Sequence, residues 1–294
     1  MSRFAYVNGR FVRYGSATVH IEDRGYQFAD GVYEVIALAG GKFVDLDLHL
    51  QRLDRSLSEL RIERPMSDRA LTFVLDNLAK RNGIRNGSVY LQITRGVAPR
   101  DFVFPRDAVP QVVAVARRAK PIAQTAIEDG VKAITIPDIR WARCDIKSVA
   151  LLPAALGKQA AREAGAYEAW QYDRDGFITE GTSSNAWIVT PDGDLVTRPA
   201  TNAILNGITR LVVIELAKAA GLRFVERPFS IKEAHAAREA FVTSTTSFVM
   251  PITQIDETPI GNGKPGSFTR ELREKYMAHM AEIAGAAAGT WKWA

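Results

Sequence analysis

The sequence predicts a mixed α/β protein with two domains. The chain has 294 residues, a length that suits one large domain or two of ordinary size. Apolar residues at helical spacing and short β-type apolar runs both recur along it, whereas residues 120–128 contain few large apolar side chains. We therefore predict a smaller N-terminal domain over residues 1–119, a linker over 120–128 and a larger C-terminal domain over 129–294.

Composition narrows the class of protein. Hydrophobic residues make up 47% of the chain and charged residues 24%, which is ordinary for a soluble protein with a substantial core. No run of 18 apolar residues and no apolar N-terminal signal region is present, so we expect neither a membrane span nor export. Cys144 is the only cysteine, which excludes intramolecular disulfides and favours a cytoplasmic location with the thiol as a small buried hydrophobe.

The charge pattern favours small anionic ligands over nucleic acid. The net charge is +5, but basic residues are interleaved with acidic ones along the chain. The densest basic group, residues 117–120, is short and precedes a proline, as in a solvated linker. The four histidines show no metal-ligand spacing, so we expect no metal site.

Local signals place the elements of the first half. Asn8-Gly9 between apolar flanks is typical of a hairpin, here over residues 4–12. Two glycines and three aromatic residues in 23–35 indicate an ordered, close-packed loop that leads into a strand. Ser67 is a plausible N-cap for a second helix. The remaining predicted elements are strands over 16–21, 32–38, 89–94 and 111–116 and helices over 46–60 and 67–81.

The first predicted helix carries a candidate anion-binding residue. Leu46, Leu50, Leu53, Leu57 and Leu60 form one apolar stripe at helical spacing. His49, Arg52 and Ser56 form the stripe beside it, so Arg52 lies at the border of the core and is able to point into a cleft. The alternative is a surface arginine in an i,i+4 pair.

The second half alternates strands with helices. Gly165 and Gly221 are good helix stops. The predicted elements are strands over 131–137, 168–172, 185–190 and 240–243 and helices over 156–164, from about 207 to 220, and over 267–284.

Lys147 is the central candidate for chemistry. It is a single cation in a weakly polar run that contains Ile146, Val149 and Leu151. An ammonium loses hydration when it is buried, and a buried lysine commonly gives up its proton and becomes an amine that attacks carbonyl carbons. The alternative is a lysine at a strand end whose amine reaches water, and this stretch alone favours that alternative.

Two further segments have the features of an anion site. Gly207-Ile208-Thr209 opens a helix, where free amides and the helix dipole attract phosphate, and Ser244-Thr245-Thr246-Ser247 offers four hydroxyls after an apolar strand. Either segment alone also fits an ordinary cap or turn. Glu180 precedes a glycine and a hydroxyl cluster. It is either a solvated turn residue or a carboxylate that holds a protonated ring nitrogen.

Taken together, these segments resemble a known family. The motifs that carry the resemblance are residues 23–28, 30–35, 49 with 52–53, 94–96 with 99–100, 143–147, 180–181 with 183–185, 204–205 with 207–210, and 242–247. In this order and spacing, the chain resembles the fold-type IV pyridoxal phosphate enzymes, most closely the bacterial D-amino acid transaminases. The similarity runs from the first hairpin to about Ala284.

The resemblance implies a fold and a set of site residues. The fold would be of α+β type, with two domains and pyridoxal 5′-phosphate in the cleft between them. Lys147 would hold the cofactor as an imine and then move a proton as acid and base, with Glu180 paired to the pyridine nitrogen and Tyr33 near the imine. The remaining cofactor-binding residues would be Arg52, Leu205, Gly207, Ile208, Thr209, Ser244 and Thr245.

The resemblance also implies how substrate is bound. Tyr33, Arg100, Phe102 and Thr246 would lie around the substrate, and the Arg100 loop would reach the site of the partner in a homodimer. Related transaminases usually have a histidine two residues after this arginine, and Phe102 stands there instead. One charge-assisted donor is lost and an apolar face is gained, so we expect looser carboxylate binding and more tolerance for bulky substrates.

The predicted activity is transfer of the amino group of a D-amino acid to a 2-oxo acid, pyruvate or 2-oxoglutarate. Three alternatives use the same scaffold: (R)-amine transamination, branched-chain amino acid transamination, and release of pyruvate from aminodeoxychorismate by a lyase. A non-catalytic binding protein without cofactor is the alternative from another class.

Overall fold

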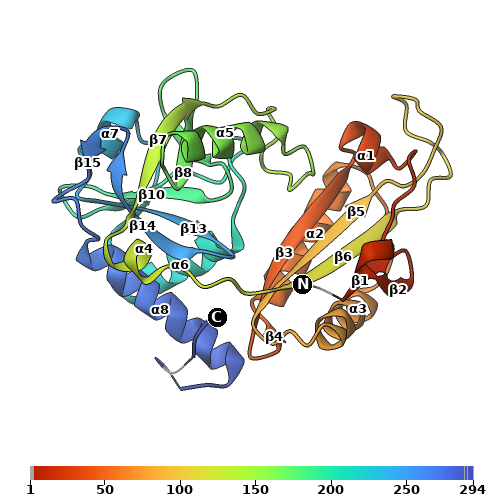
Figure 1. Cartoon of the computed structure of the whole chain (residues 1–294). Helices are drawn as coiled ribbons and strands as arrows, with labels where there is room; N and C mark the ends of the chain where they lie inside the picture. Colours follow the sequence, from red (N-terminus) through yellow and green to blue (C-terminus); the bar gives the residue numbers. More distant parts are fainter. Residues whose placement is uncertain (1–2, 288, 290, 294) are drawn as a thin grey trace. The chain divides into compact units, whose positions relative to one another are not determined.

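The computed structural model describes residues 3–287, 289 and 291–293 (Figure 1). Residues 1–2 and 294, the extreme ends of the two predicted domains, lie outside the described residues. The chain forms two compact units. The first comprises Met1–Pro121, Ile146–Ala150 and Met280–Ala294, and the second comprises Ile122–Asp145 and Leu151–His279.

These units differ from the predicted domains in three places. The division after Pro121 falls inside the predicted linker, but that linker contains helix α4 (Gln124–Glu128), which packs on the second unit. Segment 146–150 groups with the first unit because its backbone hydrogen-bonds to a strand there. Segment 280–294 does so because Ala284 lies against Gly40, where an added Cβ would come within 2.7 Å of the Ala284 carbonyl oxygen.

The first unit is built on a six-stranded antiparallel sheet with strand order β2-β1-β6-β5-β3-β4. Leucines of α2 and α3 pack against it, and each fully buried leucine contributes roughly 1.5–3 kcal/mol. The elements are β1 (Phe4–Val7), β2 (Arg10–Arg13), a 3-10 helix (Tyr14–Ser16), α1 (Arg24–Phe28), β3 (Gly31–Ala39), β4 (Lys42–Phe43), α2 (Leu46–Glu59), α3 (Asp68–Arg81), β5 (Gly87–Thr94) and β6 (Gln111–Arg118).

Local signals predicted most of this unit. Asn8 and Gly9 have φ of 45° and 87°, the positive values that a two-residue hairpin turn requires, so the hairpin is confirmed. The Ser67 hydroxyl accepts from the Ala70 amide, which confirms the N-cap of α3. The strand predicted over 16–21 is wrong, because Val19 and Ile21 are exposed and no strand partner holds this segment.

The second unit is built on a nine-stranded sheet. Eight strands follow the order β12-β11-β10-β13-β14-β7-β8-β9, and the ninth, β15, pairs with β14. It is mixed, with parallel pairs β14–β7, β7–β8 and β11–β12. Its elements after α4 are β7 (Val131–Pro137), α5 (Leu152–Glu163), β8 (Glu168–Tyr172), β9 (Ile178–Gly181), β10 (Asn185–Val189), β11 (Leu195–Thr197), α6 (Ile208–Ala219), β12 (Phe224–Glu226), α7 (Ile231–His235), β13 (Glu239–Ser244), β14 (Phe248–Ile255), β15 (Thr258–Pro259) and α8 (Ser267–Ala284).

Several features of this unit were not predicted, among them the short elements α4, β9, β11, β12, α7 and β15. Helix α5 starts four residues early, at Leu152, because Pro153 suits the first turn of a helix. Strand β14 extends the hydroxyl segment into a hairpin with β13, and Phe248 closes the turn with a φ of 61°. The hydroxyls of Ser244–Ser247 therefore lie at a hairpin turn rather than at the end of an isolated strand.

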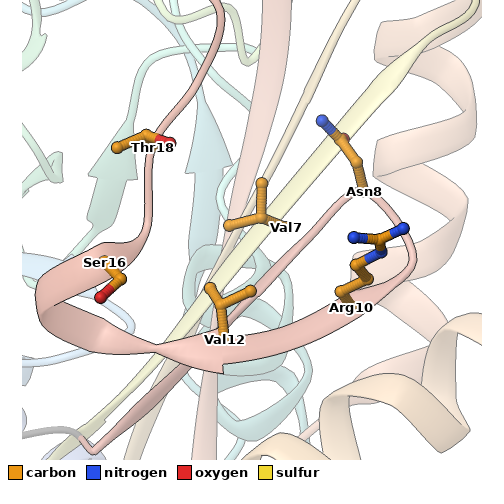
Figure 2. Close-up of a pocket in the computed structure, with 6 residues that line it drawn as sticks. All are labelled: Val7, Asn8, Arg10, Val12, Ser16 and Thr18. Carbon is orange, nitrogen blue, oxygen red and sulfur yellow. The ribbon is translucent and has the colours of Figure 1, made fainter.

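In the part of the chain that the structure describes, no helix has both the length and the apolar character needed to cross a membrane. A pocket of about 380 Å³ lies beside the β1–β2 hairpin (Figure 2). Its lining residues are Val7, Asn8, Arg10, Val12, Ser16 and Thr18. No predicted site residue lines this pocket, so the candidate site is described from the predicted residues themselves.

Candidate active site

Lys147 is held in the first unit through its backbone. Its carbonyl accepts from the Tyr33 amide at 3.0 Å, and its amide donates to the Ser56 hydroxyl at 3.3 Å. The Val149 amide donates to the Gly31 carbonyl at 3.0 Å, so the segment runs along the edge of β3. Strand β3 and helix α2 thus fix the backbone of Lys147 from two directions, and its side chain is half-buried.

The amine of Lys147 lies over an aromatic ring. Its Nζ is 4.3 Å from the centre of the Tyr33 ring, and the Tyr33 and Tyr90 rings are 5.7 Å apart. Burial, together with the neighbouring Tyr33, raises the pKa of Tyr90 to about 12, and its hydroxyl donates to Gln92 Oε1 at 2.6 Å. The two predicted residues Lys147 and Tyr33 are therefore in contact within one unit.

Arg52 belongs to a buried ion cluster in the same unit. Its Nε and Nη2 donate to the two carboxylate oxygens of Glu34 at 2.8 and 2.7 Å, and His49 Nδ1 is 2.7 Å from Glu34 Oε2. Burial alone would raise the pKa of Glu34, but Arg52 and His49 lower it to about 2. Burial also lowers the pKa of His49. The alternative of a surface arginine in an i,i+4 pair is wrong, because Glu34 is on the adjacent strand.

Glu180 is a buried carboxylate in the second unit. It accepts hydrogen bonds from Asn185 Nδ2 at 2.9 Å and from the Leu205 amide at 3.1 and 3.2 Å, and it pairs with Arg140 Nη1. The alternative of a solvated turn glutamate is wrong, because Glu180 is 5% exposed. Glu180 and Leu205, both predicted site residues, are thus brought together.

Arg140 and Asp138, which the sequence analysis missed, complete this cluster. Arg140 Nε and Nη2 donate to the Asp138 carboxylate at 3.0 and 2.7 Å. Burial raises the pKa of Glu180; Arg140 acts against that rise and Asp138 adds to it. Burial opposes the ionisation of Asp138, but hydrogen bonds from Arg140 bring its pKa below the ordinary value. The available signal was a pair of charged residues directly after strand β7.

The start of α6 lies beside the Glu180 cluster. Gly207 is the N-cap of α6, and no side chain caps it among the described residues. A Cβ at Gly207 would come within 2.2 Å of Asn185 Oδ1, and Asn185 Nδ2 also donates to the Leu205 carbonyl at 2.8 Å. The amides of Ile208 and Thr209 in the first turn therefore have no side-chain cap competing for them.

The hydroxyl turn lies at the same end of the sheet. Asn185 on β10 pairs with Thr243 on β13, the residue before Ser244. The hydroxyls of Ser244 and Ser247 are 2.6 Å apart, and the Ser247 amide donates to Ser244 Oγ at 3.2 Å. Thr245 is half-buried and Thr246 is exposed.

The remaining predicted substrate residues lie on the segment between β5 and β6, which projects beyond the strands (Figure 1). Arg100 and Phe102 are both exposed, Phe102 at 77%. The Arg100 guanidinium carbon is 5.8 Å from the centre of the Phe102 ring. These two residues contact each other and Phe28 of α1, rather than Lys147 or Tyr33.

Possible metal ligands and the Cys144 thiol are the other groups with potential chemistry. Within the described residues, no group of three or more His, Cys, Asp and Glu side chains is arranged to hold a metal ion. The Cys144 thiol donates to the Trp141 carbonyl at 3.2 Å, and burial raises its pKa to about 11. A thiol with so high a pKa is a poor nucleophile at neutral pH.

These donors suit pyridoxal phosphate. Its three functional groups are a phosphate, a pyridine nitrogen and an aldehyde, and each requires a different protein group. The uncapped first turn of α6 has amides for a phosphate, Glu180 is a buried carboxylate fixed by three partners, and Lys147 is a lysine whose backbone is fixed. The residues present therefore fit the cofactor.

Known proteins agree with this fit. The family model described as amino-transferase class IV matches residues 31–255. The chain is 45% identical over 268 residues to the D-alanine aminotransferase of Bacillus licheniformis, covering 90% of this chain and 93% of that one. It is 42% identical over 281 residues to the D-alanine aminotransferase of Listeria innocua, covering 95% of this chain and 96% of that one.

Solved structures show the same fold. The branched-chain amino acid aminotransferase of Escherichia coli superposes with a TM-score of 0.87 at 25% identity, over 100% of this chain and 98% of that one. The T.th. branched-chain amino acid aminotransferase with pyridoxamine 5′-phosphate gives 0.87 at 26% identity, over 97% of this chain and 95% of that one. The chain thus belongs to the class IV aminotransferase family and is a pyridoxal phosphate-dependent aminotransferase of fold type IV.

Proposed function

We propose that this aminotransferase moves the amino group of a D-amino acid to a 2-oxo acid, pyruvate or 2-oxoglutarate. The observation that carries the proposal is the identity of 45% to a D-alanine aminotransferase over nearly the whole of both chains. The site geometry agrees, because a lysine, a buried carboxylate and a helix start with uncapped amides are all held by defined contacts.

When bound, pyridoxal phosphate supplies a ring that accepts the electron pair left on the substrate α-carbon after deprotonation. Lys147 would hold the cofactor through Nζ, and the same amine, once released from that bond by the substrate amine, would carry the proton as acid and base. A proton-transfer group must return to one position in every turnover. The hydrogen bonds of the Lys147 backbone to Tyr33 and Ser56 support this role, since they fix the point from which the side chain extends.

Glu180 holds the pyridine nitrogen. A carboxylate there keeps the nitrogen protonated, and the fixed contacts from Asn185 and Arg140 prevent it from rotating away. Leu205, whose amide donates to Glu180 at 3.1 Å, would pack against the ring. Asn185 and Arg140 act on the cofactor through Glu180 and are positioning residues.

The phosphate is held by backbone amides and one fixed cation. The first-turn amides of Ile208 and Thr209 after Gly207, with Thr245 and Ser244 of the hairpin turn, supply hydrogen bonds. Arg52 supplies positive charge, and its pairing with Glu34 fixes the plane of its guanidinium.

Substrate is bound by Tyr33, Arg100, Phe102 and Thr246. We propose a homodimer in which the segment carrying Arg100 and Phe102 serves the partner's site, which agrees with the exposure of both side chains here. Phe102 replaces a charge-assisted donor with an apolar ring, so bulky 2-oxo acids are accepted. If acceptors with large side chains turn over no better than pyruvate, this role of Phe102 is wrong.

The test is a substrate panel read as the absorbance change of a single half-reaction. Reaction with D-alanine and D-glutamate, and not with their L-enantiomers, supports the proposal. Activity on L-valine or L-leucine alone contradicts it and favours branched-chain transamination, the activity named for the solved structures with the same fold. Sedimentation of the purified protein as a monomer contradicts the homodimer.

We also propose that the enzyme works in the cytoplasm. Cys144 is the only cysteine in the chain, and its half-buried thiol donates to a backbone carbonyl. A chain without a disulfide suits a reducing compartment. Fractionation of cells that express the full-length protein tests this location, and recovery from an exported fraction contradicts it.

A further inference from the structure

The segment that carries Arg100 and Phe102 has no helix or strand of its own to hold it in place. Residues 98–110 form no helix or strand in the described structure, although they link two long strands of the sheet. The exposed Arg100 and Phe102 lie in the first half of this segment. A side chain that binds a carboxylate must be held in one arrangement, because ordering a long arginine during binding weakens the affinity.

A buried arginine on α1 reaches into the segment. Arg24 is 2% exposed, and its Nη1 donates to the Asp101 carbonyl at 2.5 Å. Its Nε donates to Asp30 Oδ2 at 2.8 Å, so the guanidinium is fixed by a charged partner. The same Asp30 accepts from Arg95 Nε at 2.7 Å, just before the segment begins. Arg24 therefore ties Asp101, the neighbour of both Arg100 and Phe102, to the body of the unit.

Phe28, on α1, contacts both exposed side chains, those of Arg100 and Phe102. Phe28 lies 5.4 Å from the Phe102 ring, centre to centre, and the Arg100 guanidinium carbon is 5.2 Å from the centre of Phe28. The Arg24 guanidinium carbon is 4.6 Å from the same ring. Phe28 thus contacts both predicted substrate-binding side chains as well as the arginine that anchors their backbone.

Helix α1 is itself fixed to the sheet. The Asp23 carboxylate accepts from the Gly25 amide at 2.8 Å and from the Thr94 hydroxyl at 3.0 Å. A Cβ at Gly25 would come within 2.2 Å of Thr94 Cγ2, so only glycine allows this close approach to β5. Phe28 and Arg24 therefore form a stable base for the segment.

We propose that Arg24 and Phe28, the α1 platform, are positioning residues that set the affinity for the substrate carboxylate by holding Arg100 and Phe102 in one arrangement. The inference rests on the proposed role of Arg100 in binding that carboxylate. The platform acts through Arg100 and touches neither the cofactor nor the reacting atoms. It therefore affects substrate binding and leaves the chemical step unchanged.

Phe28→Leu in the holoenzyme tests this inference. Leucine keeps an apolar side chain but removes the ring over which Arg100 lies, so the D-alanine concentration for half-saturation of the half-reaction rises about fivefold. The limiting rate stays within about twofold, since no catalytic group is lost. The inhibition constant of propionate, a plain carboxylate competitor, rises by the same factor.

Phe11→Leu is the matched control. Phe11 is in the same unit and lies 4.5 Å from the Arg81 guanidinium carbon, so the same chemical change breaks an equivalent contact on a strand that carries no substrate residue. We expect it to leave the half-saturation concentration and the propionate constant unchanged. An equal change in both variants would show a general structural effect and overturn the inference.

Arg24→Lys is the second variant. Lysine retains a charge for Asp30 but cannot donate to Asp30 and Asp101 in the same fork geometry. We expect a rise in half-saturation of the same sign as in Phe28→Leu. The inference is overturned if Phe28→Leu and Arg24→Lys both leave the half-saturation concentration and the propionate inhibition constant unchanged at an unchanged melting temperature. If wild-type enzyme reacts with L-alanine alone, the proposed function fails, and the platform is tested in the same way with L-alanine because both enantiomers carry the carboxylate.

Discussion

In each unit a buried glutamate pairs with an arginine, and the pKa values of the two glutamates shift in opposite directions. Glu34 lies between Arg52 and His49, and its pKa falls to about 2. Glu180 shares Arg140 with Asp138, and burial raises its pKa. Burial acts in the same direction on both carboxylates. The difference teaches that the positive charge available to each carboxylate, rather than burial alone, decides the direction in which its pKa shifts, because Arg52 serves Glu34 whereas Arg140 is shared by Glu180 and Asp138.

The difference also separates two kinds of residue. Glu34 is a fully paired group that fixes Arg52 and stabilises the first unit. Glu180 is held by Arg140, Asn185 and a backbone amide, yet its carboxylate remains poorly compensated. A poorly compensated buried carboxylate gains most from a new positive partner, such as a protonated ring nitrogen.

The largest effect is expected beside the Glu34 cluster, at Lys147. Lys147→Ala removes both the covalent link and the proton-transfer group, so the rate of the half-reaction falls by at least about 10³–10⁴-fold. Mass spectrometry after borohydride reduction should find no cofactor attached to the chain, while circular dichroism stays unchanged. Cofactor bound covalently at another lysine would show that the wrong amine has been assigned.

Glu34→Gln tests whether the pairing of Glu34 with Arg52 stabilises the first unit. It leaves the buried Arg52 without its carboxylate, which costs about 3–5 kcal/mol of unfolding free energy at pH 7. The wild-type ionisation adds roughly 3 kcal/mol of stability above pH 4.5, and this is lost as the pH falls toward 2, because the folded pKa lies below the unfolded one. Urea titrations at several pH values measure both effects. A variant as stable as wild type, with the same acid dependence, would contradict the pairing.

Glu180→Gln tests whether the Glu180 carboxylate serves the reaction more than the stability of the second unit. The amide cannot keep the ring nitrogen protonated, so the limiting half-reaction rate falls by about 10²–10³-fold. The loss of stability should be smaller than for Glu34→Gln, because a carboxylate whose ionisation burial disfavours is removed and Arg140 keeps Asp138. A larger loss of stability than in Glu34→Gln would reverse the comparison.

Asp138→Asn should have the smallest effect on rate. It tests whether Asp138 contributes to the raised pKa of Glu180. It leaves Arg140 with one carboxylate, so the pKa of Glu180 should fall toward its ordinary value. Because the ionised form of Glu180 is the working form, the acid limb of the pH–rate profile moves to lower pH, with little change in rate at alkaline pH. An acid limb that moves to higher pH would show that Asp138 does not oppose Glu180.

The sequence predicted local structure well where the causes are local. The Asn8-Gly9 turn, the leucine stripe of α2 and the Ser67 cap depend on residues within a few positions, and the structure contains all three. The prediction over 16–21 failed because a strand needs a partner, and the alternation of Val19 and Ile21 says nothing about whether one is present.

The site was predicted less completely. The sequence named Lys147, Tyr33 and Arg52 as candidate site residues, but not Glu34, the partner of Arg52, which lies in the middle of an apolar strand. It placed Glu180 and Leu205 in the site, but not Arg140, which donates to Glu180 from 40 residues away. Neither partner could be chosen from sequence, because many charged residues are available at similar separations along the chain.

The sequence by itself determined the local turns, caps and helix stripes, the family resemblance and the residue types available for chemistry, since each depends on short stretches and their spacing. The tertiary structure alone decided which arginine meets which glutamate and how many partners each has. Charge interactions and burial act through space, over a few ångströms and without regard to chain position. The difference between Glu34, whose pKa is lowered, and Glu180, whose pKa is raised, is therefore a property of the folded chain.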